Sequence, residues 1–223
     1  MDSARNKVAI CVAAATLAAG AVVVITPGSA AHAATVACGS SCVEPYSQEY
    51  GTESIAAVDS GTLQVGLGVG VGAAGAYPAE DFEVTDFGPV SDFYEAGLVG
   101  PVVGLTWPTD QTYEFFYAPG GVQSGLCLGL ADSASTGEGV TLQECGVDAN
   151  TVWIGLAADE SDGYQPLINA TDTSADAPDV LTVLRPRLWL RGANMYLEVD
   201  PLSVVYGAVS TAQMWANESG VVG

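Results

Sequence analysis

The sequence predicts an all-β fold, and three observations support this prediction. Residues 127–130 (CLGL) and 140–145 (VTLQEC) are short apolar alternations joined by the polar turn STGEG, which is the pattern of a β-hairpin. Turn residues recur every eight to twelve positions or so along the chain, as expected for consecutive short strands. Stretches with helical periodicity are scarce, which argues against a helical or mixed fold.

The first 33 residues are not expected to belong to this fold. A basic start and an apolar run over residues 8–25 precede Ala31-His32-Ala33, which has the small-x-small pattern of a cleavage site. We therefore predict a secretory signal peptide over residues 1–33, removed after Ala33, and a secreted, extracellular protein. A retained membrane anchor is the alternative, because the apolar run nearly reaches membrane-spanning length.

The chain is strongly acidic, with 26 Asp and Glu residues against 5 Lys and Arg and a formal net charge of −21. Without the signal segment it would hold no lysine and no histidine, and its only basic residues would be Arg185, Arg187 and Arg191. Such a surface repels nucleic acid and anionic lipid, so we expect neither nucleic acid nor, after cleavage, a membrane as a partner. Histidine-based catalytic sets are absent and no carboxylate pair stands out, so we expect no enzyme activity.

Acidic residues gather at two places, residues 159–163 (DESDG) and the group Asp172, Asp176 and Asp179. Neither place has the alternating Asp spacing and late Glu of a calcium-binding loop. We interpret these residues as solvated loop charges. The sequence therefore predicts no metal ion and no cofactor.

Four cysteines would remain after cleavage: Cys38, Cys42, Cys127 and Cys145. An even number in an exported chain predicts disulfides. Three pairings are possible, and Cys38–Cys42 with Cys127–Cys145 is the most economical. The Cys127–Cys145 loop would stabilise the fold by roughly 3 kcal/mol.

The central hairpin has two weaker copies, so three internal repeats are expected in one domain. The copies run over residues 63–82, 128–153 and 197–215, and the intervening segments, 86–103 among them, are expected to supply further strands. Each copy ends in an aromatic residue expected in the core, namely Phe82, Trp153 and Trp215. Three such copies imply a β-trefoil, predicted over residues 51–223 after an N-terminal extension over residues 34–50.

The order of Cys127-Leu128, Cys145 and Trp153 resembles one repeat of the ricin-type β-trefoil lectins, in which these features recur. Gln213-Met214-Trp215 matches the Gln-x-Trp that closes a repeat in that family. The resemblance covers roughly residues 50–218. It implies the β-trefoil fold, the Cys127–Cys145 disulfide, core positions for the closing aromatics, and carbohydrate binding.

The resemblance also points to candidate sugar-binding residues. The family has an acidic residue directly after the Cys-Leu of a binding repeat, and that position holds Gln64, Gly129 and Glu198 in the three copies. A sugar site needs a fixed hydrogen-bond acceptor and an aromatic face, so the third copy is expected to carry one working site. Its candidates are Glu198, Tyr206, Gln213 and Asn217, and a weaker set in the first copy is Gln64, Tyr77 and Glu80.

Structural roles for the same third-copy residues remain open: Glu198 as an outward strand residue, Tyr206 as a core residue and Gln213 as a turn brace. At the level of the whole chain, the leading expectation is a monomeric, secreted protein that binds a glycan or polysaccharide. The alternatives are a protein-binding module, a protease inhibitor acting through the loop 117–121, or a scaffold with a decayed sugar site.

Overall fold

The structure is a computed structural model, and it describes residues 42–49, 54–59, 63–69, 82–119, 122–146, 148–183 and 195–219. The chain divides into two compact units, Met1–Ala33 and Ala34–Gly223, and all described residues belong to the second. In these ranges no helix is long and apolar enough to cross a membrane. Several predictions lie outside the described residues: the signal segment, Cys38, Tyr77, Glu80 and the arginines Arg185, Arg187 and Arg191.

Six antiparallel strands form a closed ring in the order β1, β4, β5, β8, β9 and β14. Each pairs with the next, the bridge between Gln165 and Trp215 joins the β9 side to β14, and β14 pairs back with β1. Closure leaves no open edge in the ring. The strands are β1 (Cys42–Ser47), β4 (Phe82–Pro89), β5 (Gln111–Tyr117), β8 (Trp153–Gly155), β9 (Leu167–Asn169) and β14 (Trp215–Ser219).

The ring has the same register in all three lobes. Phe82, Trp153 and Trp215 begin β4, β8 and β14. Each pairs with one residue in or just before the first strand of its own lobe and with one residue in the first strand of the next lobe. In every lobe these two pairing positions of the first strand lie four residues apart. The own-lobe partners are Val43, Tyr113 and Gln165, and the next-lobe partners are Tyr117, Asn169 and Ser47.

Three hairpins complete the lobes and pair with one another. Gln64 pairs with Thr141, Tyr196 pairs with Gly66, and Gly139 forms a bridge with Glu198. A six-stranded ring with three mutually paired hairpins is a β-trefoil, so the predicted fold class is confirmed. The hairpin strands are β2 (Ser54–Asp59) with β3 (Gln64–Val69), β6 (Leu126–Leu130) with β7 (Val140–Glu144), and β10 (Asp179–Val183) with β11 (Met195–Pro201).

The three closing aromatics share one core. Phe82, Trp153 and Trp215 belong to a single buried cluster, and none exposes more than 2% of its surface. Trp153 Nε1 donates to the Leu128 carbonyl at 2.9 Å, and Trp215 Nε1 donates to the Leu181 carbonyl at 2.8 Å. Each indole thus satisfies its one polar group inside its own lobe, and no donor is left unpaired on burial.

The trefoil symmetry corrects the alignment of the predicted copies. Leu128 in β6 and Leu181 in β10 accept equivalent indole hydrogen bonds, so these two residues correspond. The sequence alignment had instead matched Leu128 with Leu63, directly before β3, and with Leu197 in β11. It was therefore wrong by one strand in the first and third copies. Core-facing apolar residues recur in every strand of a hairpin, so a leading Leu does not identify which strand it begins.

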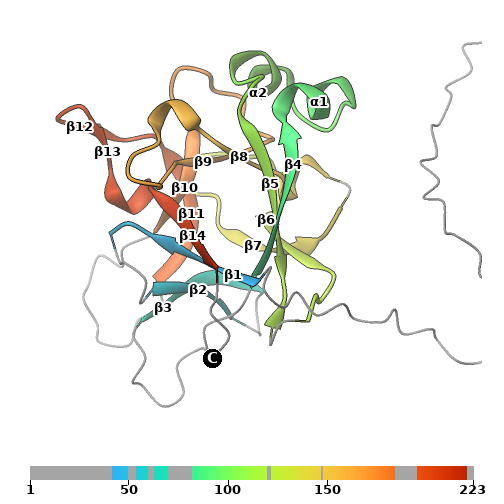
Figure 1. Cartoon of the computed structure of the whole chain (residues 1–223), viewed down its shortest axis with the longest axis vertical. Coiled ribbons are helices and arrows are strands. Elements are labelled where there is room, and N and C mark those ends of the chain that lie inside the picture. Colours follow the sequence, from blue (N-terminus) through green and yellow to red (C-terminus); the bar gives the residue numbers. More distant parts are fainter. Residues whose placement is uncertain are drawn as a thin grey trace, which may run out of the picture. The chain divides into compact units, whose positions relative to one another are not determined.

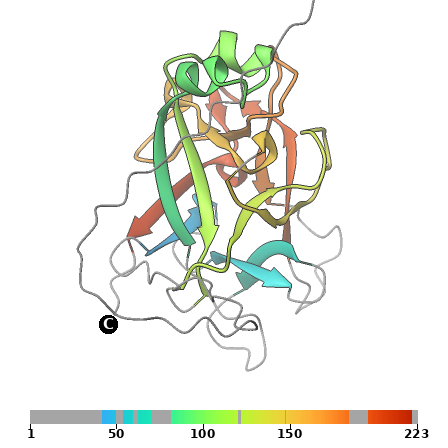
Figure 2. The same ribbon diagram turned by 90° about the vertical axis from the view of Figure 1, so that its right-hand side faces the viewer.

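A helical insertion between β4 and β5 replaces part of the segment that was expected to supply strands. Helices α1 (Val90–Glu95) and α2 (Pro101–Thr106) lie together beyond one end of the β4–β5 ribbon (Figures 1 and 2). Pro101 stands at the start of α2, where its missing N–H has no helical partner to lose. Gly104 allows the close approach of the helices, since a Cβ there would collide with the Tyr94 ring. Helices of six residues are too short to show a period in the sequence.

The insertion packs on a second buried cluster outside the main core. Val90, Val99 and Val103 from the insertion contact a group of buried residues that includes Val152 and Ile154 from the second lobe. The remaining members of the cluster are Leu156, Ile168, Ala170 and Val180. The helices are therefore fixed to the second and third lobes by apolar burial rather than by their own length.

The N-terminal boundary of the trefoil also differs from the predicted one. Strand β1 (Cys42–Ser47) lies inside the predicted extension over residues 34–50, yet it is a full member of the ring. The barrel therefore includes Cys42 and does not begin at residue 51. Nothing in the apolar pattern marked this strand, because Pro45 and Glu44 interrupt it.

Candidate binding site

A buried carboxylate lies in the first strand of the second lobe. Glu114 sits in β5 between Tyr113 and Phe115, and Phe115 points into the main core. Successive strand residues face opposite sides, so Glu114 is directed away from that core. Only 3% of its surface is exposed.

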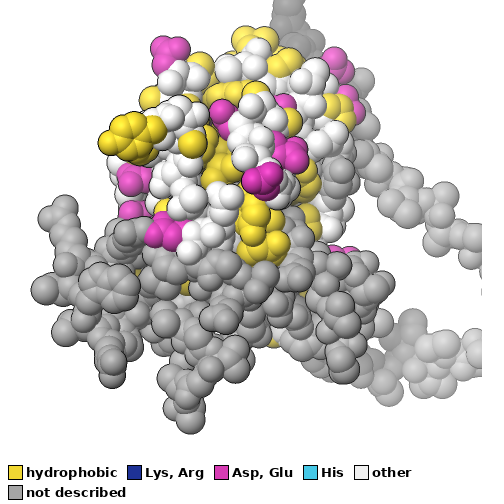
Figure 3. All heavy atoms as spheres, turned by 60° about the vertical axis from the view of Figure 1, so that its left-hand side comes forward, with side chains coloured by type: hydrophobic (Ala, Val, Ile, Leu, Met, Phe, Trp, Pro, Cys, Tyr) yellow, Lys and Arg dark blue, Asp and Glu magenta, His cyan; other side chains and the backbone are white. Residues whose placement is uncertain are grey.

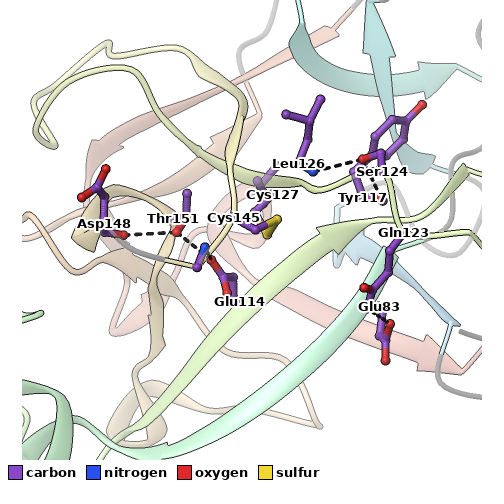
Figure 4. Close-up of a disulfide and its surroundings, with 12 residues drawn as sticks. Glu83, Glu114, Tyr117, Gln123, Ser124, Leu126, Cys127, Cys145, Asp148 and Thr151 are labelled. Atoms are coloured by element: carbon purple, nitrogen blue, oxygen red, sulfur yellow. Dashed lines mark hydrogen bonds between the residues drawn. A yellow bond between two sulfur atoms is a disulfide. The ribbon is translucent and has the colours of Figure 1, made fainter. Parts of the chain in front are cut away.

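Two donors hold one oxygen of Glu114. Thr151 Oγ1 donates to Glu114 Oε1 at 2.7 Å, and the Gly146 backbone N–H donates to the same oxygen at 3.0 Å. Figure 4 shows Glu114 between Thr151 and the disulfide. Among the described residues no hydrogen bond is formed to Oε2. The side chain is thus fixed in direction, and its other oxygen accepts no hydrogen bond from the residues that the structure describes.

The predicted Cys127–Cys145 disulfide is present and adjoins this carboxylate. It joins residues 18 positions apart, with a Cα–Cα distance of 5.0 Å. One Glu114 oxygen and the two sulfur atoms lie within 4.8 Å of one another, but the disulfide removes both sulfurs as metal ligands. The bridge instead fixes Cys145, and with it the neighbouring Gly146 N–H that binds Glu114.

A partly open pocket of about 230 Å³ lies beside Glu114. Phe93 from α1 and Leu98 from the following turn form the wall contributed by the helical insertion. Phe116 in β5, Val152, and Gly146 and Asp148 in the β7–β8 connection complete the lining. We call this the Glu114 pocket. It combines a buried carboxylate, a second carboxylate at Asp148, and two phenyl rings.

The electrostatic setting of the Glu114 pocket is negative. The sequence places no lysine, arginine or histidine anywhere in the described ranges, so no cation in this part of the chain offsets Glu114. Figure 3 shows Asp and Glu side chains distributed over one face of the molecule. The pocket therefore offers hydrogen-bond acceptors and apolar rings, and its charge excludes anionic groups.

The residues predicted for the third copy do not form a comparable site. Gln213 exposes 2% of its surface, and its amide is fully used: Oε1 accepts from Ser203 N at 2.8 Å, while Nε2 donates to Thr182 Oγ1 and the Pro201 carbonyl, both at 3.0 Å. This is the turn brace considered as the alternative. Glu198 is the register partner of Thr182, to which Gln213 donates. Glu198 and Gln213 therefore lie on the same side of β10–β11.

Burial, and to a smaller degree the Asp200 carboxylate, raise the pKa of Glu198. The other predicted residues lie at separate places. Tyr206 is fully exposed at the tip of the hairpin β12 (Val204–Val205) and β13 (Ala208–Val209), with φ of 54°, and is not a core residue. Asn217 pairs with Pro45 through the backbone, and Gln64 pairs with Thr141 between hairpins.

Asp172 corrects the interpretation of the acidic loop residues. It exposes 2% of its surface, and its two oxygens accept the backbone N–H groups of Ser174 and Asp179, each at 2.6 Å. Burial raises the pKa of Asp172, while these hydrogen bonds act in the opposite direction. Asp172 therefore braces the loop before β10 and is not a solvated charge, whereas Glu160, Asp162 and Asp176 are exposed as expected.

Comparisons with known proteins report structural likeness only. No protein-family model matches the chain, and no curated protein matches it in sequence. A designed threefold-symmetric protein, ThreeFoil, is 14% identical with a TM-score of 0.47, covering 79% of this chain and 97% of its own. The ligand-binding domain of botulinum neurotoxin serotype D, solved with N-acetylneuraminic acid, is 12% identical with a TM-score of 0.49. That match covers 80% of this chain, which spans only 41% of the neurotoxin domain.

Proposed function

We propose that this chain is a secreted carbohydrate-binding protein whose working site is the Glu114 pocket of the second lobe. The single observation that supports this most is the pairing of a buried, oriented carboxylate with Phe93 and Phe116 in one pocket. A hexose presents hydroxyl donors on its edge and C–H groups on its face, so it needs these two surfaces together. The proposal moves the site from the third lobe, where Gln213 is committed to the fold, to the second.

The proposal also includes the resemblance to the ricin-type lectins and the secretion of the protein. Similarity to the ricin-type lectins is supported by the closing aromatics Phe82, Trp153 and Trp215 and by the Cys127–Cys145 bridge. A disulfide of this kind is typical of proteins outside the reducing cytosol, and this supports export through a signal peptide over residues 1–33. We propose a monomer that binds without catalysis.

The alternative of a protease inhibitor acting through the loop 117–121 is not favoured. In the described part of that loop Ala118 is fully buried and Pro119 is half-buried. An inhibitory loop must enter the active site of its target, and these residues are not presented for that purpose.

The test is a binding screen of the purified full-length chain against immobilised glycans and insoluble polysaccharides, with Glu114→Gln alongside. Gln keeps one oxygen for Thr151 and Gly146 but replaces the free acceptor with a donor, so affinity should fall about tenfold or more. Glu160→Gln makes the same charge change at an exposed residue and should bind as the unmodified chain does.

Two results would overturn the proposal. One is an absence of binding to every glycan by a folded, disulfide-bonded chain. The other is glycan binding that Glu114→Gln leaves unchanged, which would place the site elsewhere in the molecule.

A further inference from the structure

We infer that the Glu114 pocket selects a positively charged sugar, namely an amino sugar with a free ammonium group. The inference rests on the carbohydrate-binding function proposed above and specifies the ligand class for that same pocket. It follows from the charge, the burial and the ring lining of the pocket.

The first step concerns the charge of Glu114, which no lysine, arginine or histidine offsets in the described part of the chain. Glu114 exposes 3% of its surface, and within the described ranges its hydrogen-bond donors are the neutral groups Thr151 Oγ1 and Gly146 N–H. A buried carboxylate without a cationic partner is unfavourable, because the charge is removed from water and not offset. A ligand ammonium would supply both the opposite charge and N–H donors for Oε2.

The second step concerns the walls of the pocket. Phe93 and Phe116 line it together with Glu114, and a phenyl face attracts a cation through its quadrupole. Asp148 is the other titratable residue in the lining and is also acidic. Carboxylate and ring contacts therefore favour the same ligand charge.

The third step excludes the other sugar classes. A uronic or sialic acid would bring its own carboxylate against Glu114 and Asp148, which repels it. A neutral or N-acetylated sugar could donate hydroxyl hydrogen bonds but would leave the buried charge without a counterpart. Glucosamine oligomers and their N-acetylated forms share the same sugar rings and differ at the nitrogen, which carries an ammonium charge in the first and a neutral acetamide in the second, so they form a matched pair of ligands.

The experiment is isothermal titration of the full-length chain with a glucosamine trisaccharide and with its fully N-acetylated form, at about 0.15 M salt to screen surface charge. The free-amine trisaccharide should bind about tenfold or more tightly, the size expected for a desolvated cation–ring contact. Glu114→Gln should remove this preference. Glu160→Gln should retain it, since an exposed charge of the same kind is lost there.

The outcomes separate this inference from the function on which it rests. Equal affinity for both trisaccharides, lost in Glu114→Gln, would leave the carbohydrate site in place and overturn the charge preference. If Glu114→Gln still binds the free-amine trisaccharide more tightly, the preference comes from the acidic surface and the inference is overturned. Absence of binding to either form, and to every glycan in the screen, would overturn both. The comparison of the two ligands on the unmodified chain requires no variant, so a poorly folded Glu114→Gln protein would not prevent the test.

Discussion

The second and third lobes share one register but use the residue two positions before the closing tryptophan in different ways. Thr151 and Gln213 both end a 3-10 helix, η4 (Ala149–Thr151) and η6 (Thr211–Gln213), ahead of Trp153 and Trp215. The long Gln213 side chain reaches Ser203, Thr182 and Pro201 and closes the third lobe. The short Thr151 side chain instead supports Glu114, beside which a pocket remains open. One trefoil position thus either closes a lobe or supports a buried carboxylate, according to side-chain length.

Breaking the disulfide should disturb the second lobe most strongly. In the double variant Cys127→Ala with Cys145→Ala, the loss of a loop constraint worth about 3 kcal/mol should lower the Tm by about 6–12 °C. Affinity for glycan should fall as well, because Gly146 beside Cys145 would no longer be held against Glu114. Calorimetry without reductant measures the first effect, and an unchanged Tm would contradict the bridge as a stabilising element.

Removing the brace of the third lobe should have the next largest effect. Gln213→Ala leaves the Ser203 N–H and the Thr182 hydroxyl without their partner in a buried place. The expected loss is about 1–3 kcal/mol of unfolding free energy, or a Tm lower by roughly 2–12 °C.

Gln213→Met is the matched control for this prediction, because it keeps most of the volume and removes only the hydrogen bonds. Glycan binding at the Glu114 pocket should be unchanged in both variants. A loss of binding in a folded Gln213→Ala protein would return the site to the third lobe.

The smallest effect is expected at Glu198. Burial and Asp200 raise the pKa of this carboxyl above its ordinary value, so the ionised form is disfavoured in the folded state. Its contribution is most favourable below the unfolded-state pKa and is lost as the pH rises through the folded-state pKa. Glu198→Gln should therefore raise the Tm by about 1 °C at pH 7, an effect within the range of surface substitutions.

The pH dependence of this Tm difference shows whether it comes from the charge of Glu198 or from packing. The difference in Tm between Glu198→Gln and the unmodified chain should shrink as the pH falls and the carboxyl of the unmodified chain becomes protonated. A difference that stays constant down to acidic pH would point to packing rather than charge. Glycan binding should be unaffected, in contrast to the role that the sequence suggested for this residue.

Features that depend on neighbouring residues could be predicted from the sequence, and features that depend on distant ones could not. The closing aromatics and the Cys127–Cys145 hairpin are local patterns, and the structure contains them. Glu114 belongs to the run TYEFFY, where nothing distinguishes it from an exposed strand residue. The residues that bury and orient it, Gly146 and Thr151, follow 32 and 37 positions later. The only sequence signal was a lone acid between aromatic strand residues, which is weak.

Gly129 stands where the resemblance expects an acidic residue, and the structure gives it a packing role. No sugar-binding candidate was predicted in the second repeat, where the acidic position of the family holds this glycine. The structure gives a packing reason for glycine there, because a Cβ would lie 2.9 Å from the Asn150 carbonyl of η4. The second lobe acquires an acceptor from a different strand, β5, and a wall from the α1–α2 insertion, neither of which is part of the repeat pattern.

The antiparallel contact of β1 with β14 has a consequence for how the chain can be rearranged. Val43 is the partner of Ser219, so the first and last strands of the barrel bring their outer ends side by side. A short linker could join these ends without crossing the molecule, and new termini could be opened in the exposed turn over residues 135–137. The geometry of the barrel therefore does not require the chain to begin at β1. We expect a circularly permuted chain to fold to the same barrel.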